Sequence, residues 1–168
     1  KTIVIDPGHG GNDSGTIGEN GTLEKDLTFY TAGLLARKLE ASGATVIVTR
    51  SDDTYISLTD RVKLSHLNRA DAFISLHYDS AEQANVRGIT TYYYHNYQLP
   101  LAKALSGAFE DTKELQIRTA RFGDYHVLRS NSMPAILLEL GYLSNAEEEE
   151  LITSLDYQAT IVQAIYNG

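Results

Sequence analysis

The sequence predicts one α/β domain whose sheet is largely parallel. Short β-rich segments alternate with helical segments along the chain. Residues 135–140 are almost wholly apolar, which is typical of a strand buried on both faces of a parallel sheet. The length of 168 residues suits a single domain, and no internal repeat or flexible linker divides it. We therefore expect residues 1–168 to form one domain.

The N-terminal half is expected to begin with a strand. Residues 2–6 are a short apolar run that stops at the breaker pair Pro7-Gly8. Residues 7–23 are rich in glycine and lack apolar periodicity, which indicates a long loop. The next expected elements are a helix over 25–42 that stops at Gly43, a strand over 45–49 and a helix beginning at Ser57.

The C-terminal half continues the alternation. Strands are expected over 72–76 and 89–94, followed by a helix over 99–114. Residues 115–134 are poorly patterned, with one short strand expected at Val127-Leu128. The last expected elements are the buried strand at 135–140, a helix capped by Asn145 whose first turn is acidic, and a terminal helix over 156–167.

Composition and charge exclude some classes of function. The net charge of −8 comes from 22 acidic and 14 basic residues, and no basic stripe is present, which argues against a nucleic-acid partner. No apolar run is long enough to span a membrane. Cysteine is absent, so any metal site must use His, Asp or Glu. Because a strand begins at Thr2, we expect the chain to be a domain of a longer protein.

Reactive side chains stand where the predicted strands end. His9 follows the first strand, His77 ends the third, and Glu139 lies within the late buried strand. In open α/β sheets, ligands bind outside the carboxyl ends of the strands. Glu24 stands just before the first helix, where the glycine-rich loop would return to the same edge.

Two histidines and one carboxylate suit zinc, with a fourth position left for water. Such a metal can lower the pKa of its water to ~7. Glu139 is the candidate for taking the proton and passing it to the leaving amine. Its apolar strand would raise its pKa by desolvation and make it a better base.

Each of these residues has a plainer alternative. Glu24 could be a partner of the helix dipole, and Glu139 could belong to a buried ion pair. Asp6 could be a further ligand, although an outer hydrogen-bond acceptor or a loop anchor is the preferred interpretation.

The remaining histidines and the tyrosines carry weaker predictions. We expect His66 and His95 at the surface and His126 in the lining of a cleft. Several of the 11 tyrosines fall in residues 92–97. They could stack on sugars, or they could belong to a strand with one packed and one wet face.

Four motifs resemble, in order, those of the catalytic domain of zinc-dependent N-acetylmuramoyl-L-alanine amidases, the family of bacterial autolysins and cell-separation amidases. They are IVIDPGHGG at 3–11, LEKDLT at 23–28, ADAFISLHYDS at 70–80 and MPAILLELGYLSN at 133–145. Further matches include Arg61 and the run VLR at 127–129. The resemblance covers nearly the whole chain.

The resemblance implies a twisted, mostly parallel sheet flanked by helices on both faces. It implies one Zn²⁺ held by His9, Glu24 and His77, with Glu139 as the general base and acid. The reaction would be hydrolysis of the amide between the lactyl group of N-acetylmuramic acid and the L-alanine of the peptidoglycan stem peptide. The implied location is extracytoplasmic, in the cell wall, either secreted or anchored to the membrane.

One departure from the family stands at Asp79, where the family usually has asparagine. The added charge would either tighten zinc binding or weaken binding of an acidic substrate. Asp79, His126 and Arg129 are the residues expected to contact the substrate.

Two other classes of function stay open from the residues alone: a zinc peptidase, and a wall-binding module without catalysis. The negative charge would also repel the domain from an anionic cell wall. We therefore expect a tether, a wall-binding module or an activator protein outside this chain.

Overall fold

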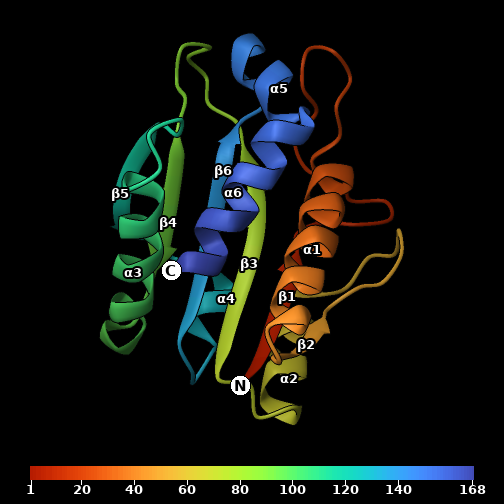
Figure 1. Cartoon of the computed structure of the whole chain (residues 1–168). Coiled ribbons are helices and arrows are strands. Elements are labelled where there is room, and N and C mark those ends of the chain that lie inside the picture. Colours follow the sequence, from red (N-terminus) through yellow and green to blue (C-terminus); the bar gives the residue numbers. More distant parts are fainter.

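A six-stranded sheet forms the centre of the computed structural model, which describes residues 1–168 (Figure 1). The strands are β1 (Thr2–Pro7), β2 (Thr45–Val48), β3 (Ala72–Asp79), β4 (Ile89–Tyr93), β5 (Ile117–Phe122) and β6 (Ala135–Tyr142). The helices are α1 (Glu24–Ala41), α2 (Leu58–Leu67), the short 3-10 helix η1 (Asn96–Gln98), α3 (Leu99–Glu110), α4 (His126–Arg129), α5 (Ala146–Ile152) and α6 (Leu155–Asn167). None of the helices combines the length and the apolar character needed to span a lipid bilayer.

The strand order is β2-β1-β3-β6-β4-β5, and most neighbouring strands are parallel. β1 runs parallel to β2 and β3, and β3 runs parallel to β6. β4 is antiparallel to β6, and β5 is parallel to β4. The predicted fold, a mostly parallel sheet with helices on both faces, is confirmed. The carboxyl ends of β1, β3 and β6 consequently lie side by side at one edge of the sheet.

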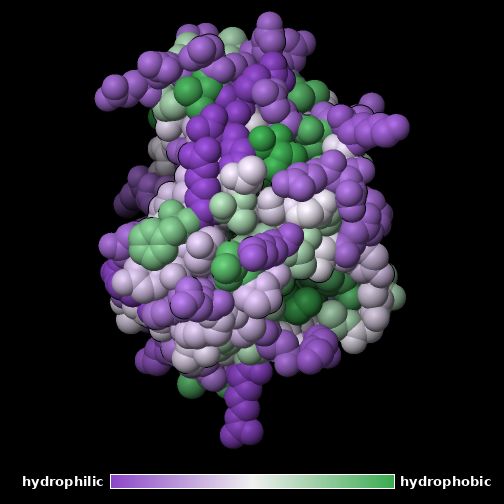
Figure 2. All heavy atoms as spheres, turned by 90° about the vertical axis from the view of Figure 1, so that its left-hand side faces the viewer, coloured by the Kyte–Doolittle hydropathy of each residue, from purple (hydrophilic) through white to green (hydrophobic).

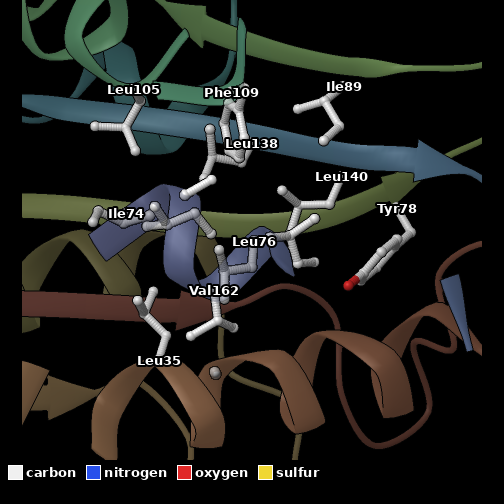
Figure 3. Packing of buried hydrophobic residues seen from close by; sticks show 14 of the residues in the cluster. Leu35, Ile74, Leu76, Tyr78, Ile89, Leu105, Phe109, Leu138, Leu140 and Val162 are labelled. Carbon is white, nitrogen blue, oxygen red and sulfur yellow. The ribbon is translucent and has the colours of Figure 1, made fainter. Parts of the chain in front are cut away.

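The two faces of the sheet are covered unequally. α1, α3 and α6 pack on one face, where the larger core contains 22 buried residues. Figure 3 shows side chains of β3 and β6 meeting Leu35 of α1 and Val162 of α6 in this core. α2 and the one-turn helix α4 pack on the other face over a core of only 8 buried residues. This thinner cover leaves room for a cleft on the α2 and α4 face.

Successive side chains of β6 point alternately toward the larger core and toward the face that carries the cleft. Leu138 and Leu140 belong to the larger core, whereas Leu137 belongs to the smaller one. Because successive side chains of a strand point to opposite faces, Glu139 shares the face of Leu137. Glu139 is also directly opposite His77 of β3 in the strand register.

The structure of residues 115–134, which show little pattern in the sequence, differs from the prediction. It contains β5, and Val127-Leu128 lies in α4 rather than in a strand, so the expected strand there was wrong. The alternation of β5 is hidden because Thr119 adopts a left-handed φ of 56° at a register shift. Val127 and Leu128 are instead both buried in the smaller core from one helical turn.

β5 is an exposed edge of the sheet and carries charged residues. Figure 2 looks onto this edge and α3, and shows a largely hydrophilic surface with separate hydrophobic spots. Arg118 and Arg121 interrupt the apolar residues of the strand, and Phe122 is exposed. Charges on an edge strand oppose pairing with another chain.

Candidate active site

Two imidazoles and one carboxylate meet at the carboxyl edge of the sheet. His9 Nε2 lies 3.0 Å from Glu24 Oε1, and His77 Nδ1 lies 3.1 Å from the same oxygen. The two ring nitrogens are 3.2 Å apart. The structure thus brings together the three residues expected from the sequence as metal ligands.

The separations of these atoms suit a small cation. Zinc bonds of about 2.0–2.1 Å in a tetrahedral arrangement place neighbouring ligand atoms about 3.3 Å apart, close to the three observed distances. Glu24 is only 3% exposed, and its only ion-pair partners are the two imidazoles. This donor set, two nitrogens and one charged oxygen, fits one Zn²⁺.

Two glycines allow the three side chains to come this close. A Cβ on Gly8 would lie 2.2 Å from His77 Cε1. Gly15 has a φ of +65°, and a Cβ there would lie 2.5 Å from Glu24 Oε2. His9 itself adopts a φ of 65°, which is uncommon for a residue with a side chain. The glycine-rich loop is therefore shaped around the three candidate ligands.

The first turn of α1 and two backbone amides orient Glu24. Its Oε1 accepts a hydrogen bond from the Tyr78 N–H at 3.1 Å, and its Oε2 accepts one from the Thr16 N–H at 2.9 Å. Burial alone would raise the pKa of Glu24, but the hydrogen bonds and charges of His77 and His9 outweigh burial and hold that pKa far below its ordinary value. The lowered pKa favours the charged carboxylate, the form that a metal ligand needs.

Asp13 supports His9 from the side opposite Glu24. Asp13 Oδ2 lies 2.8 Å from His9 Nδ1, while His9 Nε2 faces Glu24. Burial lowers the pKa of His9, but the hydrogen bonds and charges of Glu24 and Asp13 outweigh it, so the net pKa is raised. Burial raises the pKa of Asp13, but the hydrogen bonds from His9 and the Gly15 N–H make the net shift downward.

A buried polar chain supports His77. Its Nε2 lies 3.0 Å from Ser75 Oγ, which donates to Asp6 Oδ2 at 2.7 Å. Asp6 Oδ1 accepts from Thr49 Oγ1 at 2.7 Å and pairs with Arg61 at 2.9 Å. Asp6 is therefore a hydrogen-bond acceptor behind the candidate ligand His77, which is the interpretation preferred from the sequence. Asp13 and Ser75 were not predicted, because their only signal in the sequence is a polar side chain close to a candidate ligand.

Glu139 has the chemistry expected of a base. It is 6% exposed, and its Oε2 is buried without a hydrogen-bond partner. Burial, followed by the charges of Asp79 and Glu24, raises its pKa well above the ordinary value. No lysine or arginine pairs with it, so the alternative of a buried ion pair has no support.

His9, Glu24, His77 and Glu139 all line one cleft of about 480 Å³. Asp79 and His126 also line it, whereas Arg129 does not and pairs with Asp124 at the surface. Burial and the charge of Glu24 raise the pKa of Asp79. Tyr55, Leu58, Tyr125 and Val127 add aromatic and apolar side chains to the lining of the cleft.

The other histidines and the tyrosine-rich strand lie outside this cleft. His66 is exposed and contacts Ser132, and the partly buried His95 lies 2.8 Å from the Arg129 carbonyl oxygen. Tyr92 packs against the smaller core and against the ring of Tyr125, with ring centroids 5.2 Å apart. Tyr93 packs against the larger core on the opposite face, so both faces of the strand are covered and the expected wet face was wrong.

Comparison with known protein families agrees with this geometry. The family model described as N-acetylmuramoyl-L-alanine amidase matches residues 3–168. The chain belongs to this family. The predicted resemblance is confirmed.

Relatives within the family cover the chain completely. It is 44% identical over 170 residues to a probable cell wall amidase, LytH, of Staphylococcus aureus. That alignment spans all of this chain but 57% of the relative, so the chain matches little more than half of that protein.

Solved structures of family members share the fold. The catalytic domain of the amidase CwlV from Bacillus (Paenibacillus) polymyxa var. colistinus is 37% identical, with a TM-score of 0.96 over 99% of this chain and 94% of that chain. The amidase CwlD of Clostridioides difficile, solved in complex with the GerS lipoprotein, is 31% identical, with a TM-score of 0.90 over 99% and 95% of the two chains.

Proposed function

We propose that residues 1–168 are a zinc-dependent catalytic domain that hydrolyses the amide between the lactyl group of N-acetylmuramic acid and the L-alanine of the peptidoglycan stem peptide. The observation that carries the proposal is the group His9, Glu24 and His77 beside the unpartnered carboxylate of Glu139, in one cleft. Membership in the amidase family supports the choice of bond.

His9, Glu24 and His77 would hold one Zn²⁺. Zinc bound there would polarise the lactyl carbonyl and lower the pKa of a water molecule in the cleft.

Glu139 moves the proton in this proposal. Its free Oε2 accepts a proton from the attacking water as the new C–O bond forms at the lactyl carbonyl carbon. The raised pKa of Glu139 makes it a base strong enough for this step. When the C–N bond breaks, the protonated Glu139 donates the same proton to the departing alanine nitrogen. The carboxyl group ends in its starting state.

The substrate would contact residues inside and outside the cleft. Asp79 and His126 line the cleft and are proposed to contact the groups next to the scissile amide. Arg129 is exposed beside Asp124, and we propose that it contacts a part of the polymer that lies outside the cleft.

Substitution of Glu139 tests the mechanism. Glu139→Gln keeps the shape of the side chain but cannot accept the proton, so we expect the turnover rate to fall by about 10²–10⁴ while the protein still binds one zinc. Glu150→Gln, on the exposed face of α5, is the matched control and should keep full activity. Turnover is measured on purified peptidoglycan, and zinc is measured by elemental analysis.

The outcomes separate the alternatives. Full activity of Glu139→Gln would refute the role of Glu139, and loss of zinc would make Glu139 a ligand. Release of intact stem peptides identifies an amidase, whereas fragments cut within the peptide would identify a peptidase. Binding to insoluble peptidoglycan without any turnover, in the presence or absence of a chelator, would indicate a wall-binding module.

The proposed substrate places the domain outside the cytoplasm, at the cell wall, as a secreted or anchored protein. The relationship to a cell wall amidase of Staphylococcus aureus supports this location. CwlD, another member of the family, was solved in complex with the GerS lipoprotein. We extend this to the present domain as a proposal that a tether, a wall-binding module or an activator brings it to its substrate.

A further inference from the structure

The two candidate histidine ligands present different ring nitrogens to the metal position, and each has a separate support on its other nitrogen. His9 points Nε2 toward Glu24, whereas His77 points Nδ1 toward the same carboxylate. We propose that Asp13, acting directly, and Asp6, acting through Ser75, are positioning residues that select these nitrogens and thereby set the affinity for zinc. The inference rests on the zinc site proposed above.

The hydrogen bonds behind His77 determine where its proton sits. Asp6 accepts hydrogen bonds from Arg61, Thr49 and Ser75, so it acts as an acceptor only. Ser75 has a single hydroxyl hydrogen, which it donates to Asp6 Oδ2. The contact of 3.0 Å between Ser75 Oγ and His77 Nε2 therefore requires the hydrogen to lie on Nε2. In a neutral imidazole, Nδ1 then keeps its lone pair for the metal.

The same logic applies to His9 with the nitrogens exchanged. Its Nδ1 lies 2.8 Å from Asp13 Oδ2, a carboxylate that also accepts the Gly15 N–H through its other oxygen. A charged carboxylate accepts and does not donate, so the ring hydrogen lies on Nδ1. Nε2, which faces Glu24, is therefore the ring nitrogen left to bind the metal.

Arg61 joins the two supports. This side chain is 2% exposed, and its guanidinium donates to Asp6 Oδ1 at 2.9 Å and to the His9 carbonyl oxygen at 2.9 Å. The first bond holds the carboxylate behind Ser75. The second holds the main chain of His9 in its left-handed conformation. One buried cation thus keeps both ligands in place.

The expected consequence is tighter zinc binding. A metal binds through a ring nitrogen that carries no hydrogen, so a ring whose outer nitrogen is already held by a hydrogen bond keeps its orientation when zinc binds. Loss of an outer partner of a metal-binding histidine typically lowers metal affinity about 10- to 100-fold.

The first test is the zinc affinity of Ser75→Ala, measured by competition with a chelating dye in the absence of substrate. We expect the dissociation constant to rise about 10- to 100-fold. Ser65→Ala is the matched control, because Ser65 is equally buried on the same face but bonds to Val62 and Asn131. Thermal melts of the metal-free proteins report whether the two variants lose similar stability.

Two further variants complete this test. Ser75→Thr keeps the hydroxyl group and should recover most of the lost affinity. Asp13→Asn removes the carboxylate beside His9 and should weaken zinc binding by a similar factor, whereas Asp60→Asn, an exposed aspartate of α2, should not. Unchanged zinc affinity in Ser75→Ala, or an equal loss in Ser65→Ala, would overturn the role of Ser75. Unchanged affinity in Asp13→Asn would overturn that of Asp13.

The second test reads the ring nitrogens directly. In ¹⁵N-labelled, zinc-loaded protein, long-range ¹H–¹⁵N correlations should show a hydrogen on His77 Nε2 and on His9 Nδ1, with zinc on the opposite nitrogens. Zinc on Nε2 of His77 would contradict the proposal. Both tests need only metal binding, so their outcome is independent of whether the domain cleaves peptidoglycan.

Discussion

At the scale of single residues, the site contains a buried acid, Glu139, that has no lysine or arginine partner. Glu139 is buried, and its raised pKa follows first from burial and then from the charges of Asp79 and Glu24. An ionised carboxylate in such a position destabilises the fold. The same isolation leaves Oε2 free for a water molecule. Function and stability are therefore in conflict at this residue.

This conflict predicts a pH-dependent gain in stability for metal-free Glu139→Gln. The pKa of Glu139 is 4.5 in an unfolded chain and higher in the fold, so the folded state binds the proton more tightly. The stability that protonated Glu139 contributes is complete below 4.5 and is lost as the pH rises through the folded-state pKa. Glutamine has no charge to bury, so the variant should become increasingly more stable than the wild type as the pH rises from about 4.

Urea unfolding of both proteins at a series of pH values, in the presence of a chelator, measures this difference. A stability difference that does not change with pH would contradict the assigned cause. So would a variant that is less stable than the wild type at neutral pH.

His9, His77 and Glu139 could be predicted because each stands at or near the end of a strand, and Glu24 because the glycine-rich loop returns to the same edge just before the first helix. The contribution of Ser75 could not be predicted, because serine is common in strands and its partner, Asp6, is 69 residues away. Such contacts depend on the register of β1 and β3, which the sequence pattern does not determine.

At the scale of elements, α5 joins the glycine-rich loop, part of which lines the cleft, to the loop that follows β3. Its four consecutive glutamates differ in environment: Glu148 and Glu149 are buried, and their two neighbours are exposed. Glu148 accepts hydrogen bonds from the N–H groups of Gly88 and Tyr142, and Glu149 accepts one from the Asn20 N–H. The helix thus ties the glycine-rich loop and the loop after β3 to the end of β6.

Glu148→Ala is expected to destabilise the domain strongly. It leaves two buried N–H groups without an acceptor, each at a cost of roughly 1–3 kcal/mol, so we expect a loss of roughly 2–6 kcal/mol. Glu150→Ala removes an exposed glutamate from the same helix and should change stability by less than about 0.5 kcal/mol. Chemical denaturation measures both values, and equal losses would contradict this account of α5.

The elements that sequence patterns identified are those with a simple period. β1, β3 and β6 are apolar runs, and their carboxyl ends were located well enough to place the site. β5 and α4 were not identified, because a residue with positive φ interrupts β5 and a single turn is too short to show helical periodicity.

At the scale of the whole molecule, two properties bear on how the domain reaches its proposed substrate. They are its net charge and the share of a longer relative that it spans. The net charge is −8, and the chain spans 57% of the length of the LytH relative. An anionic domain is repelled by an anionic wall, most strongly at low salt, where the Debye length is about 30 Å at 0.01 M.

Binding of the isolated domain to purified cell walls should therefore strengthen as the ionic strength rises from about 0.01 M to about 0.15 M. Pelleting the walls and measuring the protein left in solution gives the bound fraction at each salt concentration. Binding that weakens over this range would indicate a local basic contact that outweighs the net charge.

The central claim is that His9, Glu24 and His77 hold one zinc ion at the carboxyl edge of the sheet. The most direct test is a crystal structure of the zinc-loaded domain with data collected on both sides of the zinc absorption edge. The account predicts a single anomalous peak about 2.0–2.2 Å from His9 Nε2, Glu24 Oε1 and His77 Nδ1. A peak bonded to other residues, or any of these three side chains turned away from the metal, would contradict it.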